Sequence, residues 1–320
     1  MVLLVTSKYD LAADLVVLEL QKRGVAYIRF NCEDFPLNVS ASWSNYQDNF
    51  LNINDELIYV KHIQSVWYRR MPEPNLHHVK LMPEIITFIQ RESSVFLDGF
   101  LKRLEILWVN SISSVALAEN KLLQLNLAEK LGFRVPKTLI SNDIKMVKIF
   151  CSSCKDVICK PITTSRLKIN DKDWGIFTES LTAEAIENSN SVQSSPIILQ
   201  ERITRKSEIR VTVVGNEVFA CTMKLREPYS TTIDWHLVDD INIDYGKIKI
   251  PTHIQTRIFK MLKGFGLCYG CFDFMLTTNN DWVFLELNPS GQWGWIERKI
   301  GFPITESIVS LLLRDAKTNV

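Results

Sequence analysis

The chain has 320 residues, of which 46% are hydrophobic and 23% are charged, and its formal net charge at pH 7 is +1. This composition is typical of a soluble globular protein, and the length is enough for roughly two domains. The near-zero charge gives no argument for nucleic acid or a membrane as the main partner, and no apolar run approaches the ~18 residues of a membrane span. Because the first apolar stretch is too short for a signal-peptide core, we expect a cytoplasmic protein.

The first third of the chain alternates between strand and helix patterns. An apolar strand opens it, an amphipathic helix follows, and Gly24 stops that helix. The expected elements are strands at 2–6, 26–30 and 106–110, short strands within 40–66, and helices near 10–23 and 80–104. This order predicts an α/β domain over residues 1–112. No G-x-G-x-x-G motif follows the first strand, so a dinucleotide site is not supported.

Beyond this domain, strands become dominant at about residue 196. We expect a central subdomain over 113–196 and a C-terminal subdomain over 197–320. The expected elements are helices at 113–131, 142–153 and 252–265, strands at 135–140, 157–161, 196–201, 207–214 and 217–225, and a hairpin at 270–288. The polar, basic segment 163–173 is predicted to be a mobile loop. The predicted fold class is α/β, with an α+β arrangement in the C-terminal half.

The hairpin at 270–288 carries the clearest chemical signal. Asn279-Asn280 accepts the left-handed conformations of a two-residue turn, which would place Asp273 directly opposite Glu286. Asn288 shares the face of Glu286, because side chains alternate along a strand. Opposed carboxylates repel each other, and a hard cation relieves that repulsion. We therefore predict a Mg²⁺ site at these three residues, with a solvated strand face as the alternative.

Several other motifs occur in order along the chain. They are Arg29-Phe30-Asn31, Trp67-Tyr68-Arg69-Arg70-Met71-Pro72, Glu119-Asn120-Lys121, Lys160-Pro161, Gln200-Glu201-Arg202-Ile203, Glu208-Ile209-Arg210 and Glu286-Leu287-Asn288-Pro289-Ser290-Gly291. With the hairpin, they resemble the ATP-grasp ligases, and most closely the graspetide synthetases, which are microviridin-type peptide maturases. The resemblance covers essentially the whole chain. It implies an ATP-grasp fold with an N-terminal pre-ATP-grasp domain, and ATP and Mg²⁺ as cofactors.

The resemblance also implies which residues hold the phosphates and the metal. Lys121 and Lys160 would contact the ATP phosphates, for which a flexible ammonium is a suitable point charge. A solvated helix lysine is the alternative for Lys121. Asp273, Glu286 and Asn288 match the magnesium ligands of the family, in agreement with the hairpin argument.

The adenosine part of ATP is expected at the start of the C-terminal subdomain. Gln200, Glu201 and Ile203 lie in the segment that resembles the hinge strand, where backbone groups would bind the adenine edge. Glu208 matches the spacing of the ribose-binding carboxylate, which accepts hydrogen bonds from the ribose hydroxyls. An ion pair with Arg210 is the alternative for Glu208.

The resemblance implies a two-step reaction on a ribosomally made precursor peptide. ATP phosphorylates an Asp or Glu side chain of the peptide, and a Ser or Thr hydroxyl or a Lys amine then displaces phosphate to close an ester or amide macrocycle. Arginine and lysine suit both the carboxylate and the acyl phosphate. We expect Arg210, Lys224 and Arg226 in this role, with an exposed strand-end charge as the alternative for Arg226.

The precursor is expected to consist of a leader and an acidic core. Arg29, Arg69 and Arg70 stand at predicted strand ends, where open α/β sheets bind ligands, and we expect them to meet the acidic side chains of the core. Ion pairs with neighbouring acidic residues are the alternative. Family analogy also allows a homodimer.

The chain departs from the family pattern at three places, one of which is the loop 163–173, which lacks the glycines often found over the phosphates. Asp234-Trp235-His236 stands where many relatives carry Asp-Trp-Arg, and Cys271 stands where many ATP-grasp enzymes have an arginine. One alternative function is an amino-acid ligase that adds glutamate to a protein or small peptide. The other is a nucleotide-binding protein without catalysis, for which an eroded metal triad would be expected.

Overall fold

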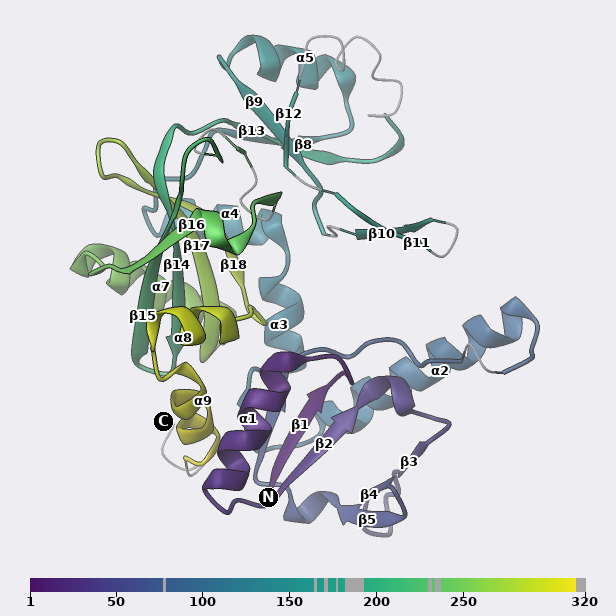
Figure 1. Cartoon of the computed structure of the whole chain (residues 1–320). Helices are drawn as coiled ribbons and strands as arrows, with labels where there is room; N and C mark the ends of the chain where they lie inside the picture. The colour runs from purple at the N-terminus through teal and green to yellow at the C-terminus, as the bar shows by residue number, and fades with distance from the viewer. Residues whose placement is uncertain are drawn as a thin grey trace.

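The computed structural model describes residues 1–76, 79–163, 166–169, 172–176, 178–181, 193–229, 232–233 and 237–314. Among these residues, no helix combines the length and apolar character needed to cross a lipid bilayer. Figure 1 shows the first domain at one end, the central subdomain at the other, and the C-terminal sheet between them.

The first domain contains four parallel strands in the order β2-β1-β6-β7. Alternation along β1 sends Val2 and Leu4 into the core beside α1, and Leu3 and Val5 into the core beside α2. The elements are β1 (Val2–Thr6), α1 (Leu11–Lys22), β2 (Tyr27–Asn31), η1 (Cys32–Asp34), β3 (Val39–Ser42), β4 (Phe50–Ile53), β5 (Glu56–Tyr59), η2 (Val60–His62), β6 (Ser65–Tyr68), α2 (Pro83–Lys102) and β7 (Leu107–Val109). Strands β3, β4 and β5 form a small antiparallel sheet. The predicted α/β domain is confirmed.

A pair of short helices replaces the single helix predicted at 113–131. Helix α3 (Ile112–Ala118) ends before Asn120, whose side chain accepts hydrogen bonds from Leu122 N and Leu123 N and so caps α4 (Lys121–Lys130). An N-cap satisfies backbone donors that lack an intrahelical partner, so it begins a new helix. Lys121 consequently occupies the first position of α4.

The central subdomain is an antiparallel sheet in the order β12-β9-β13-β8, with α5 packed on it. Its elements are β8 (Thr138–Ser141), α5 (Ile144–Ser152), β9 (Val157–Lys160), β12 (Glu179–Ser180) and β13 (Ile197–Glu201). The loop predicted at 163–173 is wrong in part, because β10 (Arg166–Ile169) pairs with β11 (Lys172–Gly175). Polar side chains do not prevent this pairing, since the ladder consists of backbone hydrogen bonds.

The C-terminal sheet has five antiparallel strands in the order β16-β15-β14-β17-β18. Its elements are β14 (Arg205–Val214), β15 (Glu217–Leu225), η6 (Asp240–Asn242), β16 (Ile243–Lys247), α7 (Thr252–Phe265), β17 (Tyr269–Thr277) and β18 (Trp282–Asn288). Helix α7 packs against one face of this sheet through a buried apolar cluster. The predicted α+β arrangement of this half is confirmed.

The tip of the β17–β18 hairpin differs from its prediction, whereas the predicted pair is present. Thr277 N donates to Asp281 O, and Asn280 has a positive φ of 63°, so three residues rather than two form the loop. Below the tip, Phe274 pairs with Phe284 but Asp273 pairs with Glu286. The extra residue, Leu285, forms a β-bulge. This bulge restores the register that a two-residue turn would have produced.

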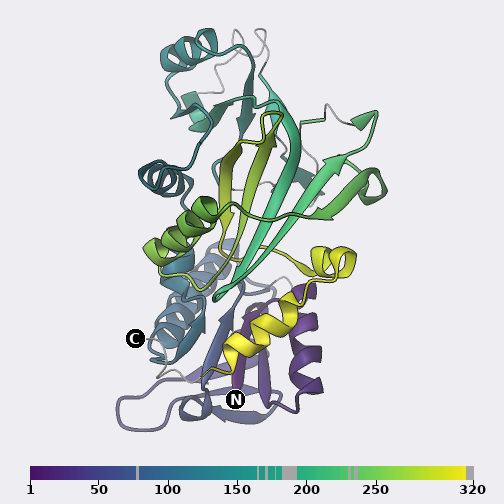
Figure 2. The same cartoon turned by 90° about the vertical axis from the view of Figure 1, so that its left-hand side faces the viewer.

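The last helix packs against the first domain. Helices α8 (Gly294–Ile300) and α9 (Ile304–Leu312) follow the hairpin, and α9 lies beside α1 (Figure 2). Ile304 and Ile308 are fully buried in the same cluster as Val2 and Val16. The first domain and the C-terminal subdomain therefore share a core, while the exact domain limits at 112/113 and 196/197 stay predictions.

Candidate active site

A row of charged residues crosses the C-terminal sheet. Arg210 of β14 is opposite Asp273 of β17, which is opposite Glu286 of β18. Opposed residues point to the same face of a sheet. Ile209 and Phe272, which directly precede Arg210 and Asp273, point to the other face and are buried in the apolar cluster that includes α7. The charged row therefore lies on the face away from α7.

These side chains form one connected network. Arg210 Nη1 donates to Asp273 Oδ2 at 2.7 Å. Asn288 Nδ2 donates to Asp273 Oδ2 at 2.9 Å and to Glu286 Oε1 at 2.8 Å. Lys121 Nζ, from the first turn of α4, pairs with Glu286 Oε2. We call Asp273, Glu286 and Asn288 the carboxylate cluster.

Positive charges keep Glu286 ionised. Burial alone would raise the pKa of Glu286, but the charges of Lys121 and Lys160 and the hydrogen bonds from Lys121 and Asn288 lower it to about 2. Lys160, at the end of β9, thus acts on this site from the central subdomain. Both lysines predicted to bind phosphate are brought to the same carboxylate.

The donor set of the carboxylate cluster fits Mg²⁺. One amide lies within hydrogen-bond reach of both carboxylates, and turning it by 180° would direct Asn288 Oδ1 to the same place. Within the described part of the chain no three His, Cys, Asp or Glu side chains gather into a metal-binding group, so the third protein ligand would be this amide oxygen. Oxygen ligands from carboxylates and an amide suit a hard cation.

Arg210 is also suited to an anion. Its side chain is 9% exposed, and its Nε has no hydrogen-bond partner among the described residues. A buried donor of this kind is costly unless it meets an acceptor. Within the part of the chain that the structure describes, the buried Nε–H of Arg210 is therefore a donor without an acceptor, beside the carboxylate cluster.

Gln124 is a site residue that sequence reasoning missed. Its Nε2 donates to Leu287 O at 2.7 Å, and its Oε1 accepts from Leu287 N at 2.8 Å. The side chain thus pairs like a neighbouring strand with the backbone between Glu286 and Asn288. In the sequence, Gln124 stands one turn after Lys121 and one turn before Ala128. Both Gln124 and Ala128 are buried, so this polar residue lies on the packed face of α4.

The segment predicted to bind adenosine connects the two sheets. Gln200 is buried and donates to Thr138 Oγ1 at 2.9 Å, and Glu201 Oε1 accepts from Lys137 N at 3.0 Å. Ile203 lies in the link between β13 and β14 and is half-buried. The side chains of Gln200 and Glu201 therefore bind the neighbouring segment at residues 137–138.

Glu208 shares the face of Arg210 because the two residues are two apart on β14. It pairs with Arg205, whose guanidinium also donates to the backbone oxygens of Thr232 and Ile233. The predicted alternative, an ion pair with Arg210, is replaced by this pair. Asp234-Trp235-His236 lies outside the described residues.

The structure does not bring Lys224 and Arg226 to the carboxylate cluster. On β15, Cys221 is opposite Arg210, so Lys224 is an odd number of residues away and points to the other face. Lys224 is opposite Asp244, and Arg226 Nη2 pairs with the same Asp244 at 2.6 Å. This geometry argues against the catalytic role predicted for both.

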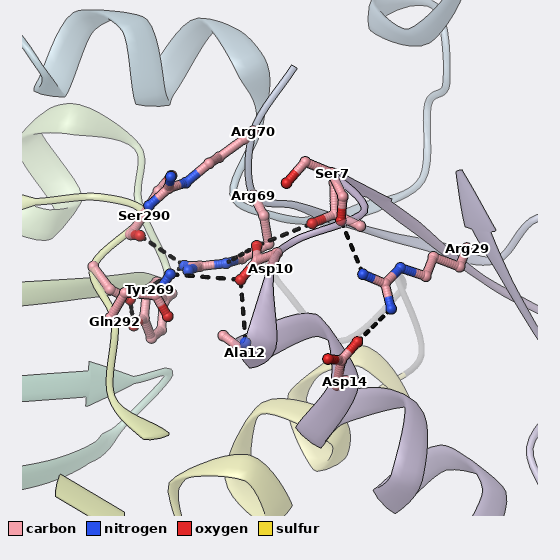
Figure 3. A network of polar contacts seen from close by, with 12 residues as sticks. Ser7, Asp10, Ala12, Asp14, Arg29, Arg69, Arg70, Tyr269, Ser290 and Gln292 are labelled. Carbon is pink, nitrogen blue, oxygen red and sulfur yellow. Dashed lines mark hydrogen bonds and ion pairs between the residues drawn. The ribbon is translucent and has the colours of Figure 1, made fainter. Parts of the chain in front are cut away.

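The arginines of the first domain differ in burial. Arg29 pairs with Asp14 and donates to Ser7 O at 2.9 Å (Figure 3). Arg69 is only 2% exposed and contacts buried groups. Arg70 is exposed.

Arg70 and Lys121 both act on the charge of Glu119. Burial raises the pKa of Glu119, and the charges of Lys121 and Arg70 partly offset that rise. Arg70 therefore shares a neighbour with the lysine that pairs with Glu286.

The chain matches two family models that together cover almost all of it. Residues 1–116 match the MvdD pre-ATP grasp domain, and residues 118–312 match the RimK-like ATP-grasp domain. At 21% identity over 215 residues, 65% of this chain and 70% of the relative, it is also similar to a tetrahydromethanopterin:alpha-L-glutamate ligase of Methanococcus maripaludis.

Two solved structures resemble the whole fold. The macrocyclase MdnC bound with precursor peptide MdnA, from Microcystis aeruginosa MRC, has a TM-score of 0.87 and 26% identity over 97% of this chain and 98% of that chain. The Chryseobacterium gregarium RiPP-associated ATP-grasp ligase in complex with ADP and a leader and core peptide has a TM-score of 0.87 and 25% identity, over 97% and 96% of the two chains. The chain therefore belongs to the RimK-like ATP-grasp ligases that carry an MvdD pre-ATP-grasp domain.

Proposed function

We propose that this ligase closes macrocycles in a ribosomally made precursor peptide, using ATP to activate Asp or Glu side chains. The observation that carries the proposal is the single charged network of Lys121, Glu286, Asn288, Asp273 and Arg210. It offers oxygen ligands, phosphate-binding cations and a buried guanidinium at one place. The full-length similarity to MdnC and to the Chryseobacterium ligase supports a peptide as the substrate.

The first chemical step is transfer of the γ-phosphoryl group. A carboxylate oxygen of the peptide attacks the γ-phosphorus, the bond to the β-phosphate oxygen breaks, and ADP leaves. Lys121 and Lys160 hold the polyphosphate, and Mg²⁺ at Asp273, Glu286 and Asn288 would neutralise the charge on the phosphate oxygens.

The second step closes the ring. A hydroxyl or amine of the same peptide attacks the acyl-phosphate carbonyl carbon, the carbon–oxygen bond to the phosphate breaks, and the departing inorganic phosphate takes the proton of the nucleophile. Arg210 binds the acyl phosphate through its guanidinium, whose buried Nε–H has no hydrogen-bond partner among the described residues. Holding the acyl phosphate and the attacking side chain close together supplies much of the rate.

The remaining residues bind adenosine and the peptide. The hinge at Gln200, Glu201 and Ile203 and the carboxylate of Glu208 bind adenine and ribose. The exposed Arg70 meets the acidic core, with Arg29 on β2, two strands away in the sheet. Lys224 and Arg226 have no part in this mechanism, because they belong to the opposite face.

The test is the intact mass of an acidic precursor peptide encoded beside this gene, after incubation with the protein, ATP and Mg²⁺. The expected result is successive loss of one water per ring, with one ADP released for each. Hydrolysis in mild base would then open esters but leave amides closed. An unchanged mass with several such peptides would contradict the proposal.

The alternative is an amino-acid ligase, favoured by the similarity to the alpha-L-glutamate ligase. That activity adds the mass of a residue to an acceptor instead of removing water. Including free glutamate in the same reaction separates the two functions. Absence of both ADP release and any covalent product would favour the nucleotide-binding protein without catalysis.

A further inference from the structure

Arg69 is a buried arginine that links the first domain to the carboxylate cluster. It follows β6, and its guanidinium lies beside the rings of Trp67 and Trp293, 5.3 and 5.2 Å from their centroids, which are themselves 5.6 Å apart. Arg69 Nε donates to Asp10 Oδ2 at 3.3 Å (Figure 3). An arginine held by two neighbouring aromatic rings and one carboxylate is fixed in orientation.

The other end of this guanidinium holds the turn that follows β18. Arg69 Nη1 donates to Ser290 O at 2.7 Å and to Gly291 O at 3.1 Å. Gly291 N donates to Asn288 O at 3.1 Å, which closes a tight turn over residues 288–291. The first residue of this turn is Asn288, so fixing the turn fixes the backbone that carries a cluster ligand.

Other groups leave the 288–291 turn little room. Asn110, at the end of β7, donates to Pro289 O at 3.1 Å, and Tyr269 Oη donates to Gly291 O at 2.6 Å. A Cβ on Gly291 would approach Cys271 Cβ to 2.4 Å, so the turn sits directly against β17. Small shifts of this turn are therefore transmitted to Asn288.

The anchor of Arg69 is itself well defined. Asp10 caps α1 by accepting from Ala12 N at 3.1 Å, and it accepts from Thr6 Oγ1 at 2.9 Å. Burial would raise the pKa of Asp10, but Arg69 and the hydrogen bond from Thr6 hold it below its usual value. Asp10 thus stays charged and orients the guanidinium.

We propose that Arg69 is a positioning residue for the metal, which sets Asn288 through the 288–291 turn and so couples the first domain to metal binding. This inference rests on the Mg²⁺ site of the proposed function. It reassigns Arg69 from the contact with acidic peptide side chains that the sequence suggested, because the side chain is only 1% exposed and lies inside the protein.

The test compares Arg69→Met with a matched control, measuring ADP affinity by calorimetry with and without Mg²⁺. Losing an outer partner of a metal ligand typically lowers metal affinity by about 10- to 100-fold. We expect the Mg²⁺-dependent gain in ADP affinity to fall by about tenfold, while ADP affinity without metal stays within about twofold. An unchanged gain would overturn the proposal.

Arg23→Met is the control. Arg23 also reaches from the first domain to the C-terminal helix, donating to Glu306 O at 3.1 Å and to Ser310 Oγ at 3.0 Å. It makes no contact with the turn, so the Mg²⁺-dependent gain should stay at the wild-type value. An equal loss in both variants would show a general effect of the domain contact and contradict the specific role of Arg69.

Two further variants allow for misfolding. Arg69→Lys keeps a charge beside Asp10 and can still donate to one carbonyl, so it should fall between wild type and Arg69→Met. Asp10→Asn combined with Arg69→Met leaves no unpaired buried charge, and should fold and show the same tenfold loss. A normal Mg²⁺ effect in this double variant would overturn the proposal.

The readout separates this inference from the proposed function. It uses no peptide, so a wild type that binds Mg²⁺ and ADP but modifies no precursor would leave the role of Arg69 standing. If the ADP affinity of the wild type were the same with and without Mg²⁺, the metal site and the positioning role would both be overturned.

Discussion

At the scale of single residues, the carboxylate cluster is balanced by cations from three parts of the chain. Lys121 comes from α4, Lys160 from β9 and Arg210 from β14. Removing one charge from such a network leaves its partners uncompensated, and the cost depends on burial. Each charged residue can therefore be tested by its effect on the others.

Replacing Glu286 by Gln should abolish ATP turnover without unfolding the protein. The amide has one oxygen ligand instead of a charged carboxylate, and it no longer attracts Lys121, so we expect a loss of about 10²–10³. Coupled measurement of ADP release gives the rate, and circular dichroism reports the fold. Asp281→Asn, an exposed carboxylate of the same hairpin paired with Arg134, is the control and should keep full activity. Undiminished turnover in Glu286→Gln would remove the metal assignment.

Lys121→Met should make the protein less stable at pH 7 but less sensitive to acid. The pKa of Glu286 is about 2 in the folded chain, below the value of about 4.3 expected when unfolded. This contribution to stability is therefore present above about pH 4 and lost as the pH falls towards 2. Without Lys121, burial raises the pKa of Glu286 and the contribution shrinks.

Urea unfolding at pH 7 and at pH 3 measures the difference. The free energy of unfolding should fall between these two pH values by more in wild type than in Lys121→Met. Lys130→Met, at the exposed end of the same helix, should follow wild type. Parallel pH dependence in all three proteins would contradict the pairing of Lys121 with Glu286.

At the scale of elements, the predictable part of the site lies within one hairpin. The Asp273–Glu286 pair was predicted correctly from a turn that is wrong, because the bulge at Leu285 cancels the extra residue of the loop. The pairing of β14 with β15 follows directly from the two-residue turn Gly215-Asn216. That register also excludes Lys224 from the charged face, and the sequence alone would have allowed this conclusion.

Contacts between distant elements could not be predicted. Lys121 and Glu286 are 165 residues apart, and Gln124 and Leu287 are 163 apart, so no local pattern connects them. The break between α3 and α4 depends on the cap of Asn120, which a continuous leucine pattern conceals. Helix and strand types follow from local periodicity, whereas their meeting points depend on packing.

Gln124→Met should loosen α4 from β18. The substitution keeps the side-chain volume but leaves Leu287 N and Leu287 O without their side-chain partner in a buried position. We expect a loss of about 3 kcal/mol in the free energy of unfolding, together with weaker Mg²⁺-dependent ADP binding. Asn126→Met, on the exposed face of the same helix, should change stability by less than about 0.5 kcal/mol. Equal stability of the two variants would contradict the role of Gln124.

At the scale of the whole molecule, the shared core should make the first domain and the C-terminal subdomain unfold together. Ile308 of α9 is fully buried in a cluster that includes Val16 of α1 and Val214 of β14. Deleting a buried side chain of this size costs about 2–5 kcal/mol. Ile308→Ala should therefore destabilise both units by the same amount, although it lies in only one of them.

Unfolding followed by tryptophan fluorescence and by circular dichroism tests this coupling. Both signals should shift to lower urea by the same amount in Ile308→Ala, and the two curves should stay superimposed. Leu313→Ala removes an exposed leucine just after the same helix and should leave both curves near wild type. If the variant instead showed two separate transitions with only one displaced, α9 would be a surface attachment. The metal site would then not depend on the first domain through this core, but through local contacts such as those of Arg69 and Asn110 with the 288–291 turn.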